Sequence, residues 1–422
     1  MKVLVISRSP WRMDNSFGNT YSNIFKGMAG IEIANIFLCD GKPDYCIEEV
    51  TRYYQIKESE MLNSIKHPFS KERYGKEIFR DSDYKLEDKN YQKTFKLGQK
   101  KRWPILYIVR ECIWNFGGKN WNDIYKFVDD FKPELVFMPL YYADYVSKFA
   151  LKLLNHLKVH LVMEVSIDVY SLRQLSFDPL YWLHRFSVRK NIRKIIKKCS
   201  YLYTISDMQK KEYEKMLKIK CGILYKFLDR GRLIKDSIID EEMFAFTGNI
   251  GNGRWKILAL LGKEIRDLGL GKLYIYTPTQ ITNKMREELK YCELNGPIKS
   301  EEVVLIQNKA RYLVHVESFS KKNVLEVRYS ISTKIMDYLS LDKEIIAIGP
   351  NNIASIEFLK QYNKAHVCTS IKTIRNSLEN LDKTQTEDKK EVLDLSRFDR
   401  DYCQKNLHDN LIKICNGGDF IA

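Results

Sequence analysis

The sequence has few of the residue patterns that hold a metal ion or a disulfide framework. Its nine cysteines are scattered from Cys39 to Cys415 without a C-x-x-C pair, and its seven histidines form no H-E-x-x-H or comparable pair. An odd number of scattered cysteines indicates reduced thiols. We therefore expect no disulfide framework and no protein-bound metal.

Long hydrophobic runs are also absent. No stretch of about 18 apolar residues occurs, so no membrane-spanning helix is expected. Met1 leads directly into Lys-Val-Leu-Val-Ile-Ser, a run that is too short for the apolar core of a secretory signal and typical of a first buried strand. The expected location is the cytoplasm.

The charge of the chain is strongly unbalanced. Its 70 lysines and arginines against 54 aspartates and glutamates give a formal net charge of +16. Nucleic acid, an anionic membrane surface and phosphate-rich substrates all suit such a charge. Nucleic acid is disfavoured, because no helix-turn-helix, zinc-finger spacing or RNP-like aromatic strand is present. The basic residues of the first half lie among Trp, Tyr and Leu, a mixture that fits lipid headgroups better.

One basic amphipathic segment, residues 181–198, is a candidate for contact with an anionic membrane. Ile192, Ile195 and Ile196 fit a buried stripe. The expected cationic surface consists of Arg185, Arg189, Lys190, Arg193, Lys194, Lys197 and Lys198. Interfacial binding and a merely solvated helix both remain open.

The chain is long enough, at 422 residues, for two domains of about 200 residues each. Short apolar segments alternate with helical patterns, which predicts parallel strands joined by right-handed crossovers. Strands are predicted at residues 3–6, 32–37, 135–138, 160–165, 202–205 and 221–225, then at 244–246, 274–276, 312–316 and 344–348; the clearest helices are at 144–157 and 207–217. The predicted fold class is α/β, with two Rossmann-like doubly wound parallel-sheet domains, a cleft between them and a C-terminal crossover helix.

The first domain is predicted to cover residues 1–240. It includes a basic excursion at about 59–118, which is compatible with an insertion, a sheet edge or a lid. The second domain is predicted over residues 241–385. Residues 386–422 form a charged linker and a helix, at 398–415, that we expect to pack back on the first domain.

The most specific pattern lies late in the chain, at residues 329–350. Small hydroxyl residues, among them Ser332 and Thr333, precede a predicted helix that carries Lys334 and Asp337, and a buried strand follows. The unpaired N–H groups of a helix start suit phosphate. A carboxylate just over one turn later could reach the hydroxyls of a ribose. An ordinary αβ unit with a solvated Asp337 is the alternative.

This segment resembles the nucleotide-sugar signature of GT-B glycosyltransferases of family 4: a loop, K-x-x-E-Y-[LM], a short turn and a P-[VI]-I-A strand. Lys334-Ile335-Met336-Asp337-Tyr338-Leu339 supplies the helix, with Asp where the family usually has Glu. The resemblance implies a hexosyltransferase that moves a sugar from a nucleoside-diphosphate donor, held by the second domain, to a glycan or lipid-linked acceptor. It also implies retention of configuration, no metal or further cofactor, and a role in cell-surface polysaccharide biosynthesis.

The turn at residues 247–256 follows the first strand of the second domain, and its glycines would let a ligand approach the backbone closely. It resembles the family's G-R-x-x-x-x-K turn. Gly248 matches the glycine, Asn249 stands where Arg is usual, and Arg254 stands where Lys is usual. The resemblance therefore names Arg254 as the contact of the donor diphosphate. Lys256 is either a second cation for it or a solvated charge.

Three more segments of the second domain are candidates for the donor pocket. Glu317 follows a predicted strand and approximates the first acidic position of the E-x7-E pattern; it either touches a substrate or caps a loop. Tyr276 ends another strand. The loop at 295–298, with Pro297, resembles the loop that receives the base.

In the first domain, Gly18 and Asn19 stand where the family often has a glycine-rich loop beside the pyrophosphate. A helix start capped by Asn15 or Ser16 is the alternative. Asp168 follows an apolar strand and is the candidate to position an acceptor or to act as a base.

Other interpretations stay open. Asp81-Ser82-Asp83 matches the D-x-D metal motif of a different glycosyltransferase fold, but chance explains this better because the motif lies in the polar excursion. A GT-B nucleotide-sugar epimerase would act without an acceptor. A non-catalytic nucleotide-sugar-binding subunit would turn over nothing.

Overall fold

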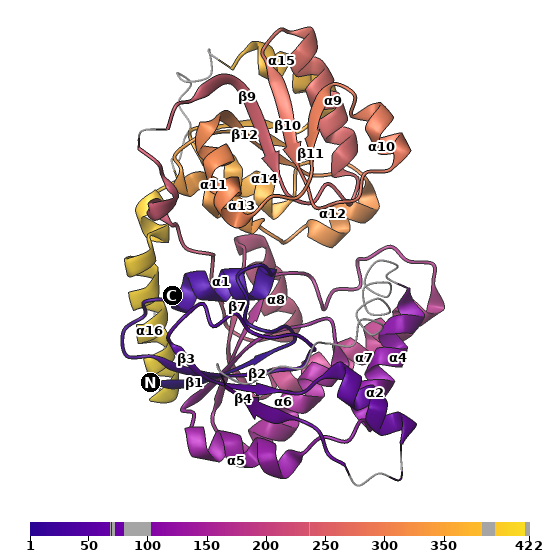
Figure 1. The fold of residues 1–422 in the computed structure, drawn as a ribbon, viewed down its shortest axis with the longest axis vertical. Coiled ribbons are helices and arrows are strands. Elements are labelled where there is room, and N and C mark those ends of the chain that lie inside the picture. The colour runs from indigo at the N-terminus through magenta and orange to yellow at the C-terminus, as the bar shows by residue number, and fades with distance from the viewer. Residues whose placement is uncertain (68, 70–71, 80–102, 236, 382–392, 418–422) are drawn as a thin grey trace. The chain divides into compact units, whose positions relative to one another are not determined.

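The computed structural model describes residues 1–422 except 68, 70–71, 80–102, 236, 382–392 and 418–422. The chain forms two compact units, drawn in Figure 1. Unit 1 consists of Met1–Leu224 and Gln404–Ala422, and unit 2 of Tyr225–Cys403. Residues 225–240, which the sequence analysis assigned to the first domain, fall in unit 2.

Unit 1 contains an eight-stranded sheet with the strand order β4-β3-β2-β1-β5-β6-β7-β8. Every neighbouring pair is parallel except β3 and β4, which are antiparallel. The strands are β1 (Lys2–Ser7), β2 (Glu32–Phe37), β3 (Val50–Gln55), β4 (Lys76–Ile78), β5 (Leu135–Pro139), β6 (His160–Val165), β7 (Cys199–Thr204) and β8 (Cys221–Ile223). Residues 3–6 of β1 are fully buried, as expected for a central strand of a parallel sheet.

The helices of unit 1 connect these strands and supply the rest of its core. They are α1 (Ser16–Phe25), α2 (Glu58–Lys66), α4 (Pro104–Phe116), α5 (Trp121–Phe131), α6 (Asp144–Leu157), α7 (Pro179–Ile196) and α8 (Asp207–Leu217). Polar side chains fix several helix starts: Asp178 caps α7, and Ser206 caps α8 by accepting a hydrogen bond from the backbone N–H of Gln209 at 3.2 Å.

Unit 2 contains a six-stranded sheet, entirely parallel, with the order β11-β10-β9-β12-β13-β14. The strands are β9 (Asp240–Thr247), β10 (Lys272–Tyr276), β11 (Cys292–Asn295), β12 (Ala310–Val316), β13 (Glu344–Ile348) and β14 (Ala365–Cys368). The helices are α9 (Arg254–Asp267), α10 (Asn283–Glu288), α11 (Ser300–Lys309), α12 (Lys321–Val327), α13 (Thr333–Ser340), α14 (Ala354–Leu359) and α15 (Ile374–Glu379).

The last helix, α16 (Arg400–Cys415), packs on unit 1 from Gln404 onward. The side-chain amide of Gln404 donates hydrogen bonds to the backbone oxygens of Ile24 and Lys26, at 2.8 and 2.9 Å. The predicted crossover helix is thus confirmed, although it begins at Arg400 rather than at residue 398. Both predicted doubly wound sheets are confirmed as well.

The basic excursion contributes regular structure where it is described. It supplies α2, the antiparallel edge strand β4 and α4, so its described part includes a sheet edge. The basic run Lys100-Lys101-Arg102 of this excursion, a candidate second contact with an anionic membrane, and the D-x-D match at 81–83 lie outside the described residues. In the part of the chain that the structure describes, no helix is long and apolar enough to cross a bilayer.

Candidate functional site

Most of the site residues predicted in the second domain lie at one edge of the unit 2 sheet. Because its strands are all parallel, their carboxyl ends meet there, the usual place for a ligand in such sheets. Gly248 follows β9, Tyr276 ends β10, Pro297 lies just beyond β11, and Glu317 follows β12.

An ion pair joins Glu317 to another predicted site residue, Arg254. Arg254, the first residue of α9, places Nε 3.1 Å from Oε2 of Glu317 and Nη2 3.0 Å from Oε1. Such two-point pairing of a guanidinium with a carboxylate fixes both side chains. The Glu317 side chain is only 6% exposed. Burial raises the pKa of Glu317 while Arg254 lowers it, so the carboxylate depends on this arginine for its charge.

Lys334, near the start of α13, brings a second cation to the pair. Gly248 has a φ of +123°, and a Cβ there would lie 2.0 Å from Nζ of Lys334. A side chain at this position would displace the amine, and the positive φ itself favours glycine. Burial, helped by Arg254, lowers the pKa of Lys334 to about 8, although Glu317 and Asp337 act in the opposite direction. An anion bound beside this amine would restore its full charge.

We expect this amine to make the binding of a diphosphate depend on pH. The unfolded chain keeps a lysine proton up to about pH 10.4, whereas the folded site releases it near pH 8. Lys334 therefore makes stability rise with pH between these values. A bound diphosphate favours the ammonium form, so its affinity should fall as the pH rises above about 8, and binding at about pH 9 should take up protons.

Titration calorimetry in buffers of different ionisation enthalpy measures this uptake. Lys334→Met should abolish the buffer dependence; heats independent of buffer in the unaltered protein would contradict this role of Lys334.

Asp337, the predicted ribose contact, has two partners that the sequence analysis did not identify. Nζ of Lys226 lies 2.6 Å from Oδ1 of Asp337, and Nη1 of Arg232 lies 3.7 Å from the same oxygen. Lys226 is 6% exposed. Both cations lie between β8 and β9, Lys226 in irregular chain and Arg232 in a short 3-10 helix, Arg230–Arg232. No local spacing connects them with Asp337, because Lys226 is 111 residues away from it in the sequence.

A buried histidine, His315, lies beside these charged side chains but carries no charge itself. His315 lies with Nε2 3.8 Å from Oε1 of Glu317. Burial, together with Arg254 and Lys334, lowers the pKa of His315 to about 3, so its ring is neutral at physiological pH. The group then consists of four cations and two carboxylates, an excess of positive charge: Arg254, Lys334, Lys226 and Arg232 against Glu317 and Asp337. Such an excess suits a diphosphate.

The remaining predicted site residues of this domain take no part in the ion pairs described above. Asn249 is exposed, and its Oδ1 accepts a hydrogen bond from the backbone N–H of Gly251 at 2.6 Å. Lys256 is exposed, with Nζ 5.5 Å from the ring centre of Trp255. Ser332 and Thr333 stand at the N-terminus of α13, as predicted, where unpaired backbone N–H groups accumulate.

In unit 1, the start of α1 is a capped helix. Asn15 accepts a hydrogen bond from the backbone N–H of Gly18 through its side chain, at 2.8 Å, and from that of Asn19 through its backbone oxygen, at 3.0 Å. A Cβ at Gly18 would lie 2.1 Å from the backbone oxygen of Arg12, which explains the glycine by packing. The capped helix start named as the alternative is therefore present. Both N–H groups already have acceptors within it.

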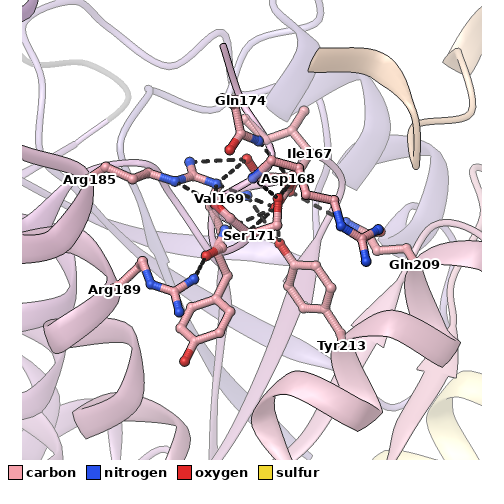
Figure 2. Close-up of polar contacts among 11 residues, drawn as sticks. Ile167, Asp168, Val169, Ser171, Gln174, Arg185, Arg189, Gln209 and Tyr213 are labelled. Carbon is pink, nitrogen blue, oxygen red and sulfur yellow. Dashed lines mark hydrogen bonds and ion pairs between the residues drawn. The ribbon is translucent and has the colours of Figure 1, made fainter. Parts of the chain in front are cut away.

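Asp168 lies inside a network of hydrogen bonds that Figure 2 shows. Its carboxylate accepts hydrogen bonds from the backbone N–H groups of Tyr170 and Ser171, at 3.1 and 2.9 Å, and from the side chains of Gln174 and Tyr213, at 2.8 and 3.2 Å. With Arg185 also 3.5 Å away and the carboxylate 3% exposed, Asp168 organises its own loop.

A different carboxyl group of unit 1 titrates close to neutral pH. Burial raises the pKa of Glu164, the fifth residue of β6, to about 7. The hydroxyl of Tyr21 donates a hydrogen bond to its Oε2 at 2.8 Å. The approximate match between this pKa and physiological pH lets Glu164 gain or lose a proton near neutral pH. The sequence alone could not show this, because the shift depends on burial.

No protein-family model matches the chain, and no curated protein matches it in sequence. Solved structures do resemble it. HepE of Anabaena, in complex with UDP and glucose, has a TM-score of 0.58 and 10% identity over 98% of this chain and 100% of its own. A glycosyltransferase of Rickettsia africae has a TM-score of 0.56 and 10% identity over 99% of both chains. A putative UDP-N-acetylglucosamine 2-epimerase of Listeria monocytogenes has a TM-score of 0.51 and 10% identity over 100% of this chain and 99% of its own.

At such low identity these likenesses concern the fold alone. They cover nearly the whole length of each chain and include both α/β units. The two parallel sheets with the crossover helix α16 match the same architecture. The chain has the GT-B fold.

Proposed function

We propose that this protein is a glycosyltransferase of the family 4 type that moves a sugar, most simply a hexose, from a nucleoside-diphosphate donor to a glycan or lipid-linked acceptor. The observation that carries this proposal is the cationic group at the carboxyl edge of the unit 2 sheet, where Arg254 and Lys334 surround the buried Glu317. HepE, a protein of the same fold, was solved with UDP and glucose. A uridine nucleotide is therefore the first donor to test.

The proposed chemistry follows from where charge develops. Glycosyl transfer passes through an oxocarbenium-like state while negative charge grows on the leaving diphosphate. Arg254 and Lys334 would neutralise that charge, and the N-terminal end of α13 would add to the effect. Asp337 would orient the ribose. We propose retention of configuration without a metal ion, with Glu164 or Asp168 of unit 1 near the acceptor.

The proposal extends to the surroundings of the reaction. A lipid-linked acceptor is confined to a membrane face, and the net charge of +16 favours an anionic one. We therefore place the protein in the cytoplasm, in peripheral contact with the membrane, in a pathway of cell-surface polysaccharide synthesis.

An epimerase is the second candidate, because a putative 2-epimerase shares the fold. An epimerase would change the sugar of the free nucleotide sugar, whereas a transferase releases the nucleotide only as the sugar leaves. Incubation of the protein with UDP-sugars, followed by nuclear magnetic resonance of the sugar, separates the two activities.

Nucleotide binding itself is testable without knowledge of the acceptor. A ligand at about 100 times its Kd adds roughly 2.7 kcal/mol of stability, so a matching nucleoside diphosphate should raise the melting temperature by several degrees. The monophosphate should stabilise less, because it lacks the phosphate that Arg254 and Lys334 would contact. A thermal-shift panel of nucleoside diphosphates, monophosphates and nucleotide sugars measures this. The proposal fails if no nucleotide stabilises the protein, or if monophosphates equal diphosphates.

A further inference from the structure

One outer face of α4 in unit 1 is apolar along its whole length. Its exposed side chains include Ile105, Val109, Cys112 and Phe116, spaced at i, i+4, i+7 and i+11. This spacing places them in one stripe. Single exposed apolar residues are common on soluble proteins, but a stripe of them indicates an interaction surface.

The exposed face of α7 is apolar in its first half and basic in its second. Leu183 and Phe186 are 61% and 54% exposed. One turn further on, the same face carries Lys190, then Arg193 and Lys194, all exposed. The helix therefore presents apolar and cationic side chains in succession along one line.

These two helices lie side by side (Figure 1). The ring of Tyr107 in α4 stacks on His184 of α7 with centroids 5.5 Å apart, and His184 is 3.4 Å from the carboxylate of Glu111. Their facing sides pack on each other, and the surface that the pair presents to solvent consists of the exposed sides described above.

The loop before α7 extends this surface with further apolar side chains. Leu172 and Leu175 are exposed, and Phe177 is fully exposed. The loop is nevertheless held firmly from within, because Asp168 accepts several of its hydrogen bonds and Arg185 donates to the backbone oxygen of Ser171 at 3.0 and 2.6 Å (Figure 2). Its apolar side chains are thus presented on an ordered scaffold.

The same contacts correct the cationic surface that the sequence analysis predicted for this helix. Arg185 is buried beside Asp168, and Arg189 is half-buried, with Nη1 donating to the backbone oxygen of Tyr170. These two arginines donate hydrogen bonds to the loop before α7 and are therefore not part of the cationic surface. Only the second half of α7 is basic on its outside.

We propose that the outer faces of α4 and α7, with the loop at 172–177, form a docking surface for an anionic lipid bilayer. Apolar side chains enter the interfacial region, while Lys190 and Lys194 contact the headgroups. Charge complementarity favours this occupant, because apolar side chains followed by cations match the acyl region and the anionic headgroups of a bilayer. The inference deepens the proposed function, since this is the membrane face on which a lipid-linked acceptor would be found. Docking itself requires no catalysis.

Flotation with vesicles tests the docking surface directly. The protein should float with phosphatidylglycerol–phosphatidylcholine vesicles at low salt, and weakly or not at all with phosphatidylcholine alone. Combined replacement of Phe177, Leu183 and Phe186 by Ser should lower the partition coefficient by more than about 100-fold, since each exposed apolar side chain that enters the interface is worth roughly tenfold. Lys190→Gln and Lys194→Gln should each lower it about fivefold.

Matched controls separate docking from folding and from the proposed activity. Leu305 and Ile371 of unit 2 are also exposed apolar residues, and their replacement by Ser should leave flotation unchanged. Thermal stabilisation by UDP should survive in every variant, so a loss of nucleotide binding and a loss of docking are told apart. If the triple variant unfolds, Phe177→Ser alone serves, because its exposed ring supports no packing.

Several results would overturn the docking surface. These are equal flotation with neutral vesicles, no flotation at low salt, and an equal loss in the control variant. A dimer that is present without vesicles and abolished by the triple substitution would instead make this surface a contact between two copies of the chain.

Discussion

Replacing Arg254 by Ala should lower kcat/KM for sugar transfer by about 10²-fold or more. Negative charge on the leaving diphosphate grows in the transition state, so a cation aimed at it matters more there than in the ground state. The substitution also leaves Glu317 without its bidentate partner at 2.9–3.1 Å. Since burial already raises the pKa of Glu317, this carboxyl should then take up a proton, which limits the loss of stability.

Two companion variants define the role of Arg254. Arg254→Lys keeps the charge but loses the two-point geometry, and should recover part of the activity. Lys256→Ala, two helical positions away and exposed, should change little. Initial rates of nucleotide release, measured with the donor that stabilises the protein best, report both effects. Full activity in Arg254→Ala would remove this residue from the mechanism; a requirement for a metal ion, revealed by a chelator, would contradict the proposed electrostatics.

Asp337→Ala should weaken donor binding by roughly 1.5–3 kcal/mol, the range for hydrogen bonds to a charged group, or about 10- to 150-fold in Kd. It should also destabilise the protein, because it leaves Lys226, 6% exposed, without its partner at 2.6 Å. Breaking a fully buried pair costs about 3–5 kcal/mol. The cost here should be smaller, because Asp337 keeps 16% exposure and Arg232 stands nearby. Asp337→Glu should be tolerated.

A double variant separates these two effects of Asp337. Lys226→Met combined with Asp337→Ala removes the unpaired charge, so stability should return while donor binding stays weak. Calorimetric Kd values and melting temperatures of both variants give the comparison. Unchanged affinity in Asp337→Ala would exclude the ribose contact, and restored affinity in the double variant would show that only the orphaned lysine had mattered.

The sequence predicts the central strands well and the outer ones poorly. Strands β2, β6 and β13 have their predicted bounds, because central strands of a parallel sheet are buried on both faces and form apolar runs. The helices α6 and α8 also have theirs. Strands β3 (VTRYYQ) and β11 (CELN), by contrast, contain exposed polar residues and carry little periodic signal. Their pairing with neighbouring strands decides their structure.

The candidate site is only partly readable from the sequence for a related reason. Glu317 and Gly248 follow strands, and Arg254 and Lys334 stand at helix starts. Each of them can therefore be predicted as a site residue from its type and position alone. That Arg254 binds Glu317, 63 residues further on, appears only when β9 and β12 pair. Lys226 and Arg232 lie between the last strand of unit 1 and the first strand of unit 2, where the sequence shows no helical or strand periodicity. Their contact with Asp337 is purely tertiary.

The path of α16 has a consequence for how the chain folds during synthesis. Unit 2 is continuous in sequence, whereas unit 1 lacks its last helix until residues 404–415 have been made. Leu407, Leu411 and Ile414 are buried, and Gln404 binds the backbone at Ile24 and Lys26. The amino-terminal unit is synthesised first, but part of its apolar surface therefore stays exposed to solvent until α16 has been made. By then the whole of unit 2 has been synthesised and can fold. On the ribosome the order of completion is the reverse of the order of synthesis.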